Sequence, residues 1–549
     1  MSRSKNFIYS PADTIRRIRE NLREGRYSQA EGIFGIIKEL AQNAEDAEAR
    51  QLQLAWTLNL PNATHPLLQG PGLLAINDGK FKAEDGRAIR RFGLNSKAAD
   101  AASIGKFGLG LKSVFHLAEV FFFTAVDERD QVLDADILNP WSDEVGGLHR
   151  DWDDWSTADQ DLMRSFVRSF TTEGPRFCLW VPLRRRDQLG QVGPIMPIFP
   201  GEIDVDSLFA QDLPERLARL LPMLRHLRDI SIWIALPEAT RRHFSVTVDD
   251  GSVRRIDMEE LDNLEENSPR SFAGEAVVRD AASDLSVIFS GREQRRSDPE
   301  LRSLEQAEFW PQDIAMDEKS GEDRHIREKA CPHAAVCFVA TRNPSVNPRL
   351  AIHWSMFLPL SEPEVIPLEE SNCCIDVFLH GYFFVDAGRN QIEGINAESP
   401  GSAQDSSGLR RAWNQLLARR GTLPLLPLAM VDITNKAGWD GDKVACLTRQ
   451  LATSSLFRKF ASDICRDWIW VKRLSPDGTM RWEVASGSLP FYVLPDTSAA
   501  QPLACVVFPG LRQLAVRALI AFRDAPRLAS ARPARWPADF VEELVSVRK

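Results

Sequence analysis

Apolar residues recur every three or four positions in the N-terminal part of the chain, and this spacing predicts two helices. The first covers residues 11–24, with Ser10 as N-cap and Pro11 at the first helical position. The second runs from about Gln29 to Arg50. Its apolar positions form one continuous stripe, made of Ile33, Ile36, Ile37, Leu40, Ala44 and Ala47. This stripe predicts a helix with one buried face and a polar face beside it.

Runs of β-branched and aromatic residues predict the strands of a mixed sheet. In the first half these runs lie at residues 52–58, 73–77, 120–126, 177–183 and 230–236, and a helical run at 213–227 precedes the last of them. Helices and strands in this irregular order are typical of an α+β fold with helices on one side of the sheet. A hairpin is predicted over residues 244–258, because Asp250-Gly251 is a favoured turn dipeptide.

Changes of pattern divide the chain into four predicted regions. Residues 1–236 form the first domain, and residues 237–330 contain the predicted hairpin and a mobile insertion at 297–328. Strands return in a second α/β domain at 331–430. Residues 431–549 form a C-terminal α+β region with a last hairpin near 468–493, and we assign no role to it.

Composition adds limits on environment and partners. The 549 residues are 44% hydrophobic and 26% charged, as in ordinary globular proteins, and the net charge of -10 gives no overall attraction to nucleic acid. Arg184, Arg185 and Arg186 form either a local basic surface or, as we favour, a solvated strand end. No signal-peptide pattern occurs, and no run reaches the roughly 20 apolar residues of a membrane span. We therefore expect a soluble, cytoplasmic protein.

The eight cysteines include no CxxC pair, which favours a reducing compartment over a disulfide framework. Four residues within a short segment, His325, Cys331, His333 and Cys337, have the side-chain types of a zinc site. The alternative, which we favour, is that Cys337 in AAVCFVA is a small hydrophobic residue of a buried strand.

The polar face of the second predicted helix carries Glu39, Asn43 and Asp46, spaced four and three residues apart. These offsets place the three side chains on one face. A carboxylate and a carboxamide one turn apart can activate a water molecule and bind Mg2+ through oxygen. The alternative is a simple solvated face.

Two glycine-containing segments follow. The predicted strand GLLAIN ends at Asp78-Gly79, where the carboxylate can accept a hydrogen bond from an exocyclic amine of a base, unless the dipeptide is only a turn. In SIGKFGLGLKSVFH, three glycines precede a predicted helix that starts near Leu111, and such a helix N-terminus can bind anions: Gly105, Gly108 and Gly110. Lys106 and Lys112 either add charge there or are solvated. The segment is not a P-loop, because Lys112 comes one residue too late.

Together and in this order, ExxxNxxDA, a strand ending in Asp-Gly, and GxxGxG opening a helix resemble the GHKL ATPases. That superfamily includes DNA gyrase, the ninety-kilodalton heat-shock chaperones, histidine kinases and MutL. The run GKFGLGLKSVFHLAE is most similar to the sacsin-type and heat-shock-chaperone versions. Phe357 to Leu360, Ile375 to Ile392 and RRAWNQLL at residues 410–417 resemble the segment that follows the ATPase in sacsin-like proteins.

The resemblance implies a Bergerat-type ATPase fold for residues 1–236, a second, transducer-like domain at 331–430, and ATP and Mg2+ as cofactors. Glu39 would orient the attacking water, Asn43 would coordinate Mg2+, Asp78 would bind adenine, and Arg389 would sense the terminal phosphate. The nucleotide lid would span residues 81–103. The other residues implied at the nucleotide are Asp46, Gly79, Lys97, Gly105, Lys106, Phe107, Gly108, Leu109, Gly110 and Lys112.

Two features depart from the family pattern. The sequence Asp78-Gly79-Lys80-Phe81 lacks the second glycine of DxGxG, and Gly174-Pro175 stands where the family often has Gly-Thr. We expect an ATPase that couples slow hydrolysis to lid closure and domain rearrangement, as a chaperone or clamp with a protein client or partner subunits. A homodimer is one form that such a protein can take. The alternative is a nucleotide-gated interaction subunit of a larger complex, for bacterial defence or DNA handling, with little hydrolysis.

Overall fold

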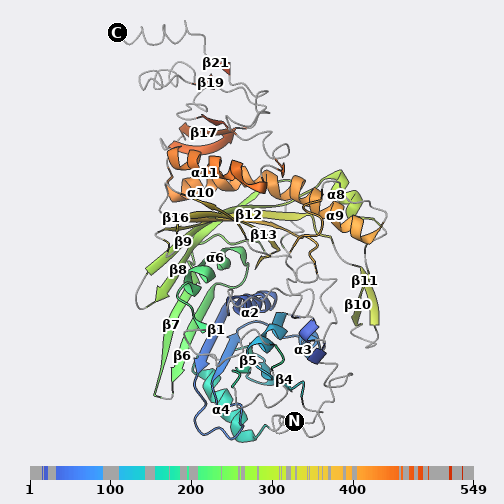
Figure 1. Cartoon of the computed structure of the whole chain (residues 1–549), viewed down its shortest axis with the longest axis vertical. Coiled ribbons are helices and arrows are strands. Elements are labelled where there is room, and N and C mark those ends of the chain that lie inside the picture. Colours follow the sequence, from blue (N-terminus) through green and yellow to red (C-terminus); the bar gives the residue numbers. More distant parts are fainter. Residues whose placement is uncertain are drawn as a thin grey trace.

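The computed structural model describes most of residues 33–460 and a few short pieces on either side of them (Figure 1). Within that range it leaves out residues 91–109, 142–154, 172–173, 186–193, 197–207, 237, 257–259, 261–265, 281–283, 308–309, 311, 317–322, 328–329, 343, 345–346, 357, 361–362, 369–372, 387–390, 398–404, 440 and 457–458. Outside it, the described residues are 15–16, 18–20, 22, 469–474, 480–485, 492–493, 519–521 and 534–535.

The first half alternates helices and strands. Its helices are α2 (Phe34–Asp46), α3 (Ala83–Arg90), the 3-10 helix η1 (Gly110–His116), α4 (Thr157–Arg168), α6 (Leu213–Leu220) and the 3-10 helix η4 (Leu221–Met223). Its strands are β1 (Gln51–Thr57), β2 (Gly72–Asn77), β3 (Phe121–Val126), β4 (Val132–Leu138), β5 (Arg176–Pro182), β6 (Asp229–Leu236) and β7 (Ala239–Val248). Each strand predicted for this half is present.

The second half adds strands and then helices. The strands are β8 (Arg270–Asp280), β9 (Asp284–Arg295), β10 (Gln312–Met316), β11 (Asp323–Arg327), β12 (His333–Arg342), β13 (Arg349–Met356), β14 (Leu358–Pro359), β15 (Glu364–Pro367) and β16 (Cys373–Gly381). The helices are α8 (Pro299–Glu305), α9 (Ser406–Leu417), the π-helix η5 (Ala418–Thr422), η6 (Leu423–Leu425), α10 (Leu426–Ala437) and α11 (Gly441–Thr453). The later strands are β17 (Ile469–Leu474), β18 (Met480–Ala485), β19 (Tyr492–Val493), β20 (Leu519–Ala521) and β21 (Ala534–Arg535), and β17 and β18 form the predicted last hairpin.

One 14-stranded sheet runs through both halves, in the order β14-β13-β16-β12-β9-β8-β7-β6-β1-β2-β5-β3-β4, with β15 paired to β13. The β1–β6 and β13–β16 pairs are parallel, and the other pairs are antiparallel. The α+β class with a mixed, largely antiparallel sheet is thereby confirmed. The sheet continues across residues 236 and 330, and the predicted domain boundaries stay predictions.

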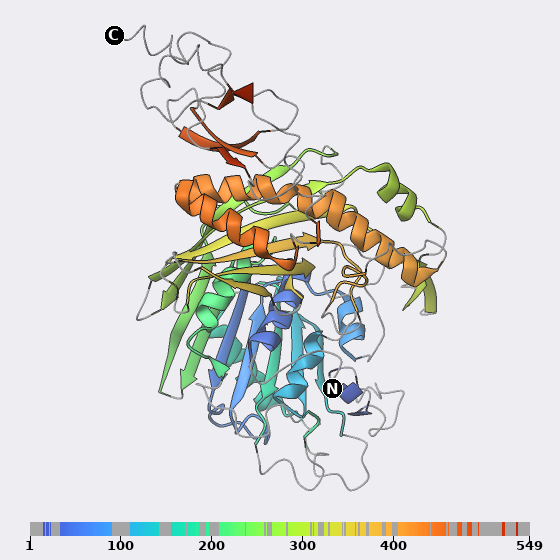
Figure 2. The same ribbon diagram turned by 45° about the horizontal axis from the view of Figure 1, so that its top comes forward.

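Two hydrophobic cores lie on the two faces of the second half of this sheet. On β12, Ala335, Cys337 and Val339 face the core that also contains α2 and α6, whereas Val336 and Phe338 face the core under α9 and α10. This period of two on a strand buried on both faces follows from the pleat. Figure 2 shows α9, α10 and α11 lying across the outer face of these strands. The second half of the sheet is therefore the middle layer, between α2 and α6 on one side and α9 to α11 on the other.

In the first half, helices cover both faces of the sheet. Phe115 of η1 contacts Phe121 of β3, with ring centroids 5.4 Å apart, on the same face as α2. Phe166 of α4 contacts Trp180 of β5 at 6.3 Å on the opposite face. The expectation that helices lie on one side therefore omitted α4.

Three local predictions need correction. The second predicted helix ends at Asp46 and not at Arg50, because Glu48 adopts a left-handed conformation (φ 57°) and β1 starts at Gln51. The hairpin predicted at 244–258 is wrong, because β7 pairs with β6 and β8, and Val253 after the turn bridges to Ala273. The predicted insertion at 297–328 contains α8 and the β10–β11 hairpin.

Among the described residues, no helix is long and apolar enough to cross a membrane. The same residues contain no group of three or more histidine, cysteine or acidic side chains that could hold a metal ion, and Cys337 is fully buried in β12. The interpretation of Cys337 as a core residue is therefore confirmed.

Candidate functional site

Helix α2 carries three of the predicted site residues. Glu39 is buried with 9% of its surface exposed, and Asn43 and Asp46 are half-buried. The Nδ2 atom of Asn43 is buried and has no hydrogen-bond partner among the described residues. Because a buried amide without a partner is costly, it marks a place where a ligand or a water molecule would be stabilised.

The end of β2 folds back onto the end of α2. Oδ1 of Asp78 accepts hydrogen bonds from the backbone N–H groups of Arg50 (2.7 Å) and Gln51 (2.8 Å), and the Lys80 N–H donates to the carbonyl of Ala47 (2.9 Å). The second carboxylate oxygen of Asp78, Oδ2, has no hydrogen bond to any described residue. Asp78 therefore anchors the start of β1 with one oxygen and keeps the other for a further donor.

Gly79 is required by the packing at this junction. A Cβ atom at position 79 would lie 2.6 Å from the Cβ and 2.7 Å from the carbonyl oxygen of Ala47. The group that approaches Gly79 most closely is therefore the C-terminal end of α2.

The 3-10 helix η1 packs against α2 and supplies further buried polar groups. It starts at Gly110, close to the predicted start at Leu111. Lys112 is 2% exposed, and burial lowers the pKa of its ammonium group to about 7. The hydroxyl of Ser113 is fully buried, and no residue in the described part of the chain forms a hydrogen bond with it. A solvated Lys112 is thereby excluded.

Arg184 holds the C-terminal end of η1. Its guanidinium group donates to Oε1 of Glu119 (2.7 Å) and to the carbonyls of Phe115 (3.0 Å) and His116 (3.1 Å), and it is 2% exposed. A cation at a helix C-terminus is favourable. The prediction of a solvated strand end is therefore wrong for Arg184, and so is its alternative, a basic surface.

The described part of the predicted lid is α3. Its last residue, Arg90, makes ion pairs with Asp134 and Asp136 of β4, both at 2.5 Å, and lies 5.2 Å from the ring centroid of Phe123. The Phe81 ring stacks on Phe177 at 5.8 Å. These contacts fix the first part of the lid against the edge of the sheet, on the face that α2 covers.

Several predicted site residues lie outside the described residues, and they remain predictions: Lys97, Gly105, Lys106, Phe107, Gly108, Leu109 and Arg389. The chain on either side of residues 387–390 is nevertheless closely held. Val385 bridges to Ile392, and the N–H of Asp386 donates to the carbonyl of Gln391 (3.0 Å). The two flanks of residues 387–390 therefore form a defined base.

Helix α9 fixes that base. Asn414 accepts from the N–H of Phe384 (2.8 Å) and donates to the carbonyls of Phe384 (2.7 Å) and Glu393 (2.9 Å). Trp413 donates to the carbonyl of Tyr382 (3.1 Å). Two segments quoted for the family resemblance, Ile375 to Ile392 and RRAWNQLL, thus contact each other directly.

Sequence reasoning missed Glu45 of α2. Its carboxylate accepts hydrogen bonds from three consecutive backbone N–H groups just before β6, those of Arg225 (2.6 Å), His226 (3.0 Å) and Leu227 (3.0 Å). The only available signal was an acidic residue that lies next to Ala44 of the apolar stripe.

Three side chains connect this site to the second half of the sheet. The guanidinium group of Arg225 donates to the Tyr382 hydroxyl (2.6 Å), and Nζ of Lys38, next to Glu39, donates to the carbonyl of Pro359 (3.3 Å). Arg219 of α6 pairs with Asp376 of β16 at 3.5 Å. A movement of α2 would therefore change the positions of β14, β16 and the segment that leads to residue 389.

Comparison with known proteins covers the part of the chain that carries most of the predicted site residues. Residues 12–245 match the family model of the Sacsin domain. A stretch of 91 residues is 35% identical to human sacsin. This stretch makes up 16% of this chain and 2% of sacsin. The matched region extends from before α2 into β7, and it contains every predicted site residue except Arg389. The sacsin-type resemblance is thereby confirmed for this region, in a chain that aligns with only a small part of that relative.

The oxygen atoms on α2 suit Mg2+. Glu39 and Asn43 offer carboxylate and carboxamide oxygens, the ligand types that this hard cation binds. If Oδ1 of Asn43 coordinated a cation, its unpaired Nδ2 atom would be left to donate to a phosphate oxygen. The described residues thus fit a magnesium nucleotide in the chemistry of their donor atoms.

Proposed function

We propose that this protein binds ATP with Mg2+ between α2, the end of β2, η1 and the lid, and hydrolyses it slowly to drive interdomain rearrangement. The observation that carries the proposal is the unpaired, buried Nδ2 of Asn43, one helical turn from the buried Glu39. The match of residues 12–245 to the Sacsin domain supports it.

In this proposal Glu39 orients the attacking water and Asn43 holds Mg2+, while Oδ2 of Asp78 accepts the adenine amine. Asp46 and Gly79 complete the adenine side, and the glycines from Gly105 to Gly110 surround the phosphates. Lys112 is buried in η1, and a nearby phosphate would favour its charged form. Arg389, which follows the segment that α9 holds at Phe384, senses the terminal phosphate.

The contacts of Glu45, Arg225 and Tyr382 support the coupling part of the proposal. They connect the helix that carries Glu39 to the segment that carries position 389, through hydrogen bonds of 2.6 to 3.0 Å. Closure around a nucleotide would therefore change the position of the second half of the sheet, as in chaperones and clamps. The client is a protein, the chain acts in the cytoplasm, and closure brings two copies together.

Binding is tested by isothermal titration calorimetry with Mg-ATP. Asp78→Asn should weaken binding of Mg-ATP at least tenfold, because the amide cannot accept from adenine with the same geometry. A tenfold loss of affinity corresponds to about 1.4 kcal/mol of binding free energy. Asp250→Asn, a fully exposed residue in the turn after β7, is the matched control and should bind like the wild type. Equal affinity of the wild type and Asp78→Asn would contradict the proposed adenine site.

The second candidate function is a nucleotide-gated interaction subunit that binds ATP without appreciable turnover. The missing second glycine after Gly79 and the engagement of Asp78 Oδ1 by β1 favour it. It predicts that Mg-ATP changes which proteins are co-purified, whereas phosphate release stays at the level of the Glu39→Ala variant.

A further inference from the structure

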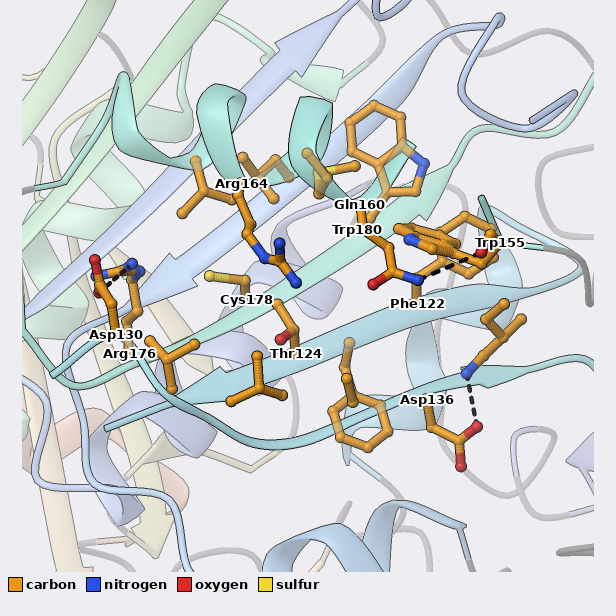
Figure 3. A pocket seen from close by; sticks show the side chains of 18 of the residues that line it. Phe122, Thr124, Asp130, Asp136, Trp155, Gln160, Arg164, Arg176, Cys178 and Trp180 are labelled. Carbon is orange, nitrogen blue, oxygen red and sulfur yellow. Dashed lines mark hydrogen bonds and ion pairs between the residues drawn. The ribbon is translucent and has the colours of Figure 1, made fainter. Parts of the chain in front are cut away.

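The first half of the sheet has a cavity on the face opposite to α2. It has a volume of about 310 Å3 and lies between α4 and strands β3, β4 and β5 (Figure 3). Its floor is made by the side chains of Phe122, Thr124, Cys178 and Trp180, and Met163 and Val167 of α4 form its roof. This volume is at the lower end of the range of about 300–1,000 Å3 that small-molecule pockets have.

The cavity is separate from the proposed nucleotide site. On β3 the side chains alternate, so that Phe122 and Thr124 face the cavity while Phe121 contacts Phe115 of η1 on the other face. The body of the sheet therefore lies between the cavity and α2. The lining residues Phe123 and Asp136 also hold Arg90 of the lid, but a ligand in the cavity would not touch α2, η1 or the end of β2.

The charges around the cavity have a surplus of arginine. Asp130 is shared by Arg176 (2.5 Å) and Arg168 (3.4 Å) at one end. Arg164 points from α4 into the cavity (Figure 3), and its ion-pair partner is Asp161, an exposed residue on the same helix at 2.6 Å. Asp136 also lines the cavity, but it is paired with Arg90 of α3 at 2.5 Å. Asp130 and Asp161 are therefore the carboxylates left to the three guanidinium groups. Because an exposed ion pair is worth little, Arg164 can exchange Asp161 for a ligand anion.

Polar atoms inside the cavity are few and well separated. The carboxamide of Gln160 donates to the carbonyl of Trp155 (3.3 Å), and the Thr124 hydroxyl lies on the floor among apolar side chains. The rings of Phe122 and Trp155 meet edge to face at 4.4 Å and form an aromatic wall. Such walls favour flat, apolar molecules.

We propose that this cavity binds a small amphipathic molecule with a flat apolar body and one anionic group. The apolar body of the ligand lies between the strand side chains and α4, against the rings of Phe122 and Trp155. The anionic group is held by Arg164 at the mouth, in place of Asp161. This would be a second ligand site, on the sheet face that α2 does not cover.

Two fluorescent probes with almost the same ring system test the proposal. 1-Anilinonaphthalene-8-sulfonate carries an anionic group, and N-phenyl-1-naphthylamine does not. We expect the full chain to bind the anionic probe about tenfold more tightly, a difference typical of one charge-assisted contact. Arg164→Met should remove this preference, whereas Arg241→Met, an exposed arginine on β7, should keep it. Equal dissociation constants for the two probes in the wild type would overturn the proposal.

A blocking variant locates the probes. Val132 lies at the rim of the cavity with 48% of its surface exposed, so Val132→Trp narrows the mouth without disturbing the core. We expect it to weaken both probes at least fivefold, with an unchanged circular dichroism spectrum. Unchanged binding in Val132→Trp, or displacement of the probes by saturating Mg-ATP, would place them elsewhere and overturn the assignment.

Discussion

Two regions around α2 differ in whether their buried polar groups have hydrogen-bond partners. At the junction formed by Glu45, Asp78 and Gly79, the Glu45 carboxylate and Oδ1 of Asp78 accept five backbone N–H groups between them. At the α2–η1 contact, represented by Asn43, Lys112 and Ser113, Nδ2 of Asn43 and the Ser113 hydroxyl are buried without a hydrogen-bond partner among the described residues. Since unpaired buried groups cost stability, the first region mainly holds the fold, with Oδ2 of Asp78 left for a ligand, and the second region is built to receive a ligand.

The largest expected effect is at the junction. Glu45→Ala would leave three backbone N–H groups of residues 225–227 without their acceptor, and each unsatisfied donor costs about 1–3 kcal/mol. We expect the free energy of unfolding to fall by at least about 3 kcal/mol in urea titrations. Lys80→Ala, which breaks the exposed ion pair with Glu48 at 2.8 Å, is the control and should cost no more than about 1 kcal/mol. Similar losses in both variants would show that the junction has no special role.

The second test concerns packing at the same junction. Gly79→Ala would force a Cβ atom against Ala47, and overpacking of this kind costs about 1–3 kcal/mol. In the control Gly251→Ala, the nearest atom is the end of the Asp249 side chain at 3.0 Å, which can move. The urea midpoint of the control should stay close to that of the wild type. A Gly79→Ala midpoint equal to that of the control would mean that Gly79 is not required by the approach of α2.

The α2–η1 contact should show itself in the pH dependence of stability. The Lys112 pKa is lowered to about 7, whereas the unfolded chain keeps this proton up to about pH 10.5. The unfolded state therefore binds more protons between these values, and stability rises with pH there, by about 1 kcal/mol between pH 7.5 and 8.5. Unfolding at both pH values should show that Lys112→Met lacks this increment. An identical increment in Lys112→Met would refute the assignment.

The smallest effect on stability is expected for Asn43. Asn43→Ala removes an amide whose Nδ2 has no partner, and the free energy of unfolding should change by less than about 0.5 kcal/mol. Asn414→Ala is the matched control, because all three hydrogen bonds of that amide would be lost. Its free energy of unfolding should fall by about 2 kcal/mol or more. Affinity for Mg-ATP should show the reverse order. A large loss of stability in Asn43→Ala would mean that this amide supports the fold.

The contrast between the two regions also explains what the sequence could predict. The predicted strands β1, β2, β3, β5 and β6, the polar face of α2 and the helix after the glycines follow from local spacing, and the structure contains all of them, whereas β4 was not predicted. The junction could not be predicted, because Glu45 receives its N–H groups from residues 180 to 182 positions later. The hairpin at 244–258 failed for a similar reason, since distant β8 is the partner that β7 takes.

The candidate site was predictable in its residue types and less so in their environments. The order of Glu39, Asn43, Asp78 and the glycines pointed to the sacsin-type region before any contact was known. Burial of Lys112, the clamp of Arg184 on η1 and the cavity under α4 depend on how separate elements pack. No periodicity within one segment carries that information.

The most direct test of the account is phosphate release from Mg-ATP by the purified full chain, compared between the wild type and Glu39→Ala, with Mg-ATP binding measured on both. The account predicts slow turnover by the wild type, a rate at least 100-fold lower in Glu39→Ala, as expected for loss of a general base at about 10²–10⁴-fold, and similar binding of Mg-ATP by both. An unchanged rate in Glu39→Ala, or no binding of Mg-ATP by the wild type, would contradict it.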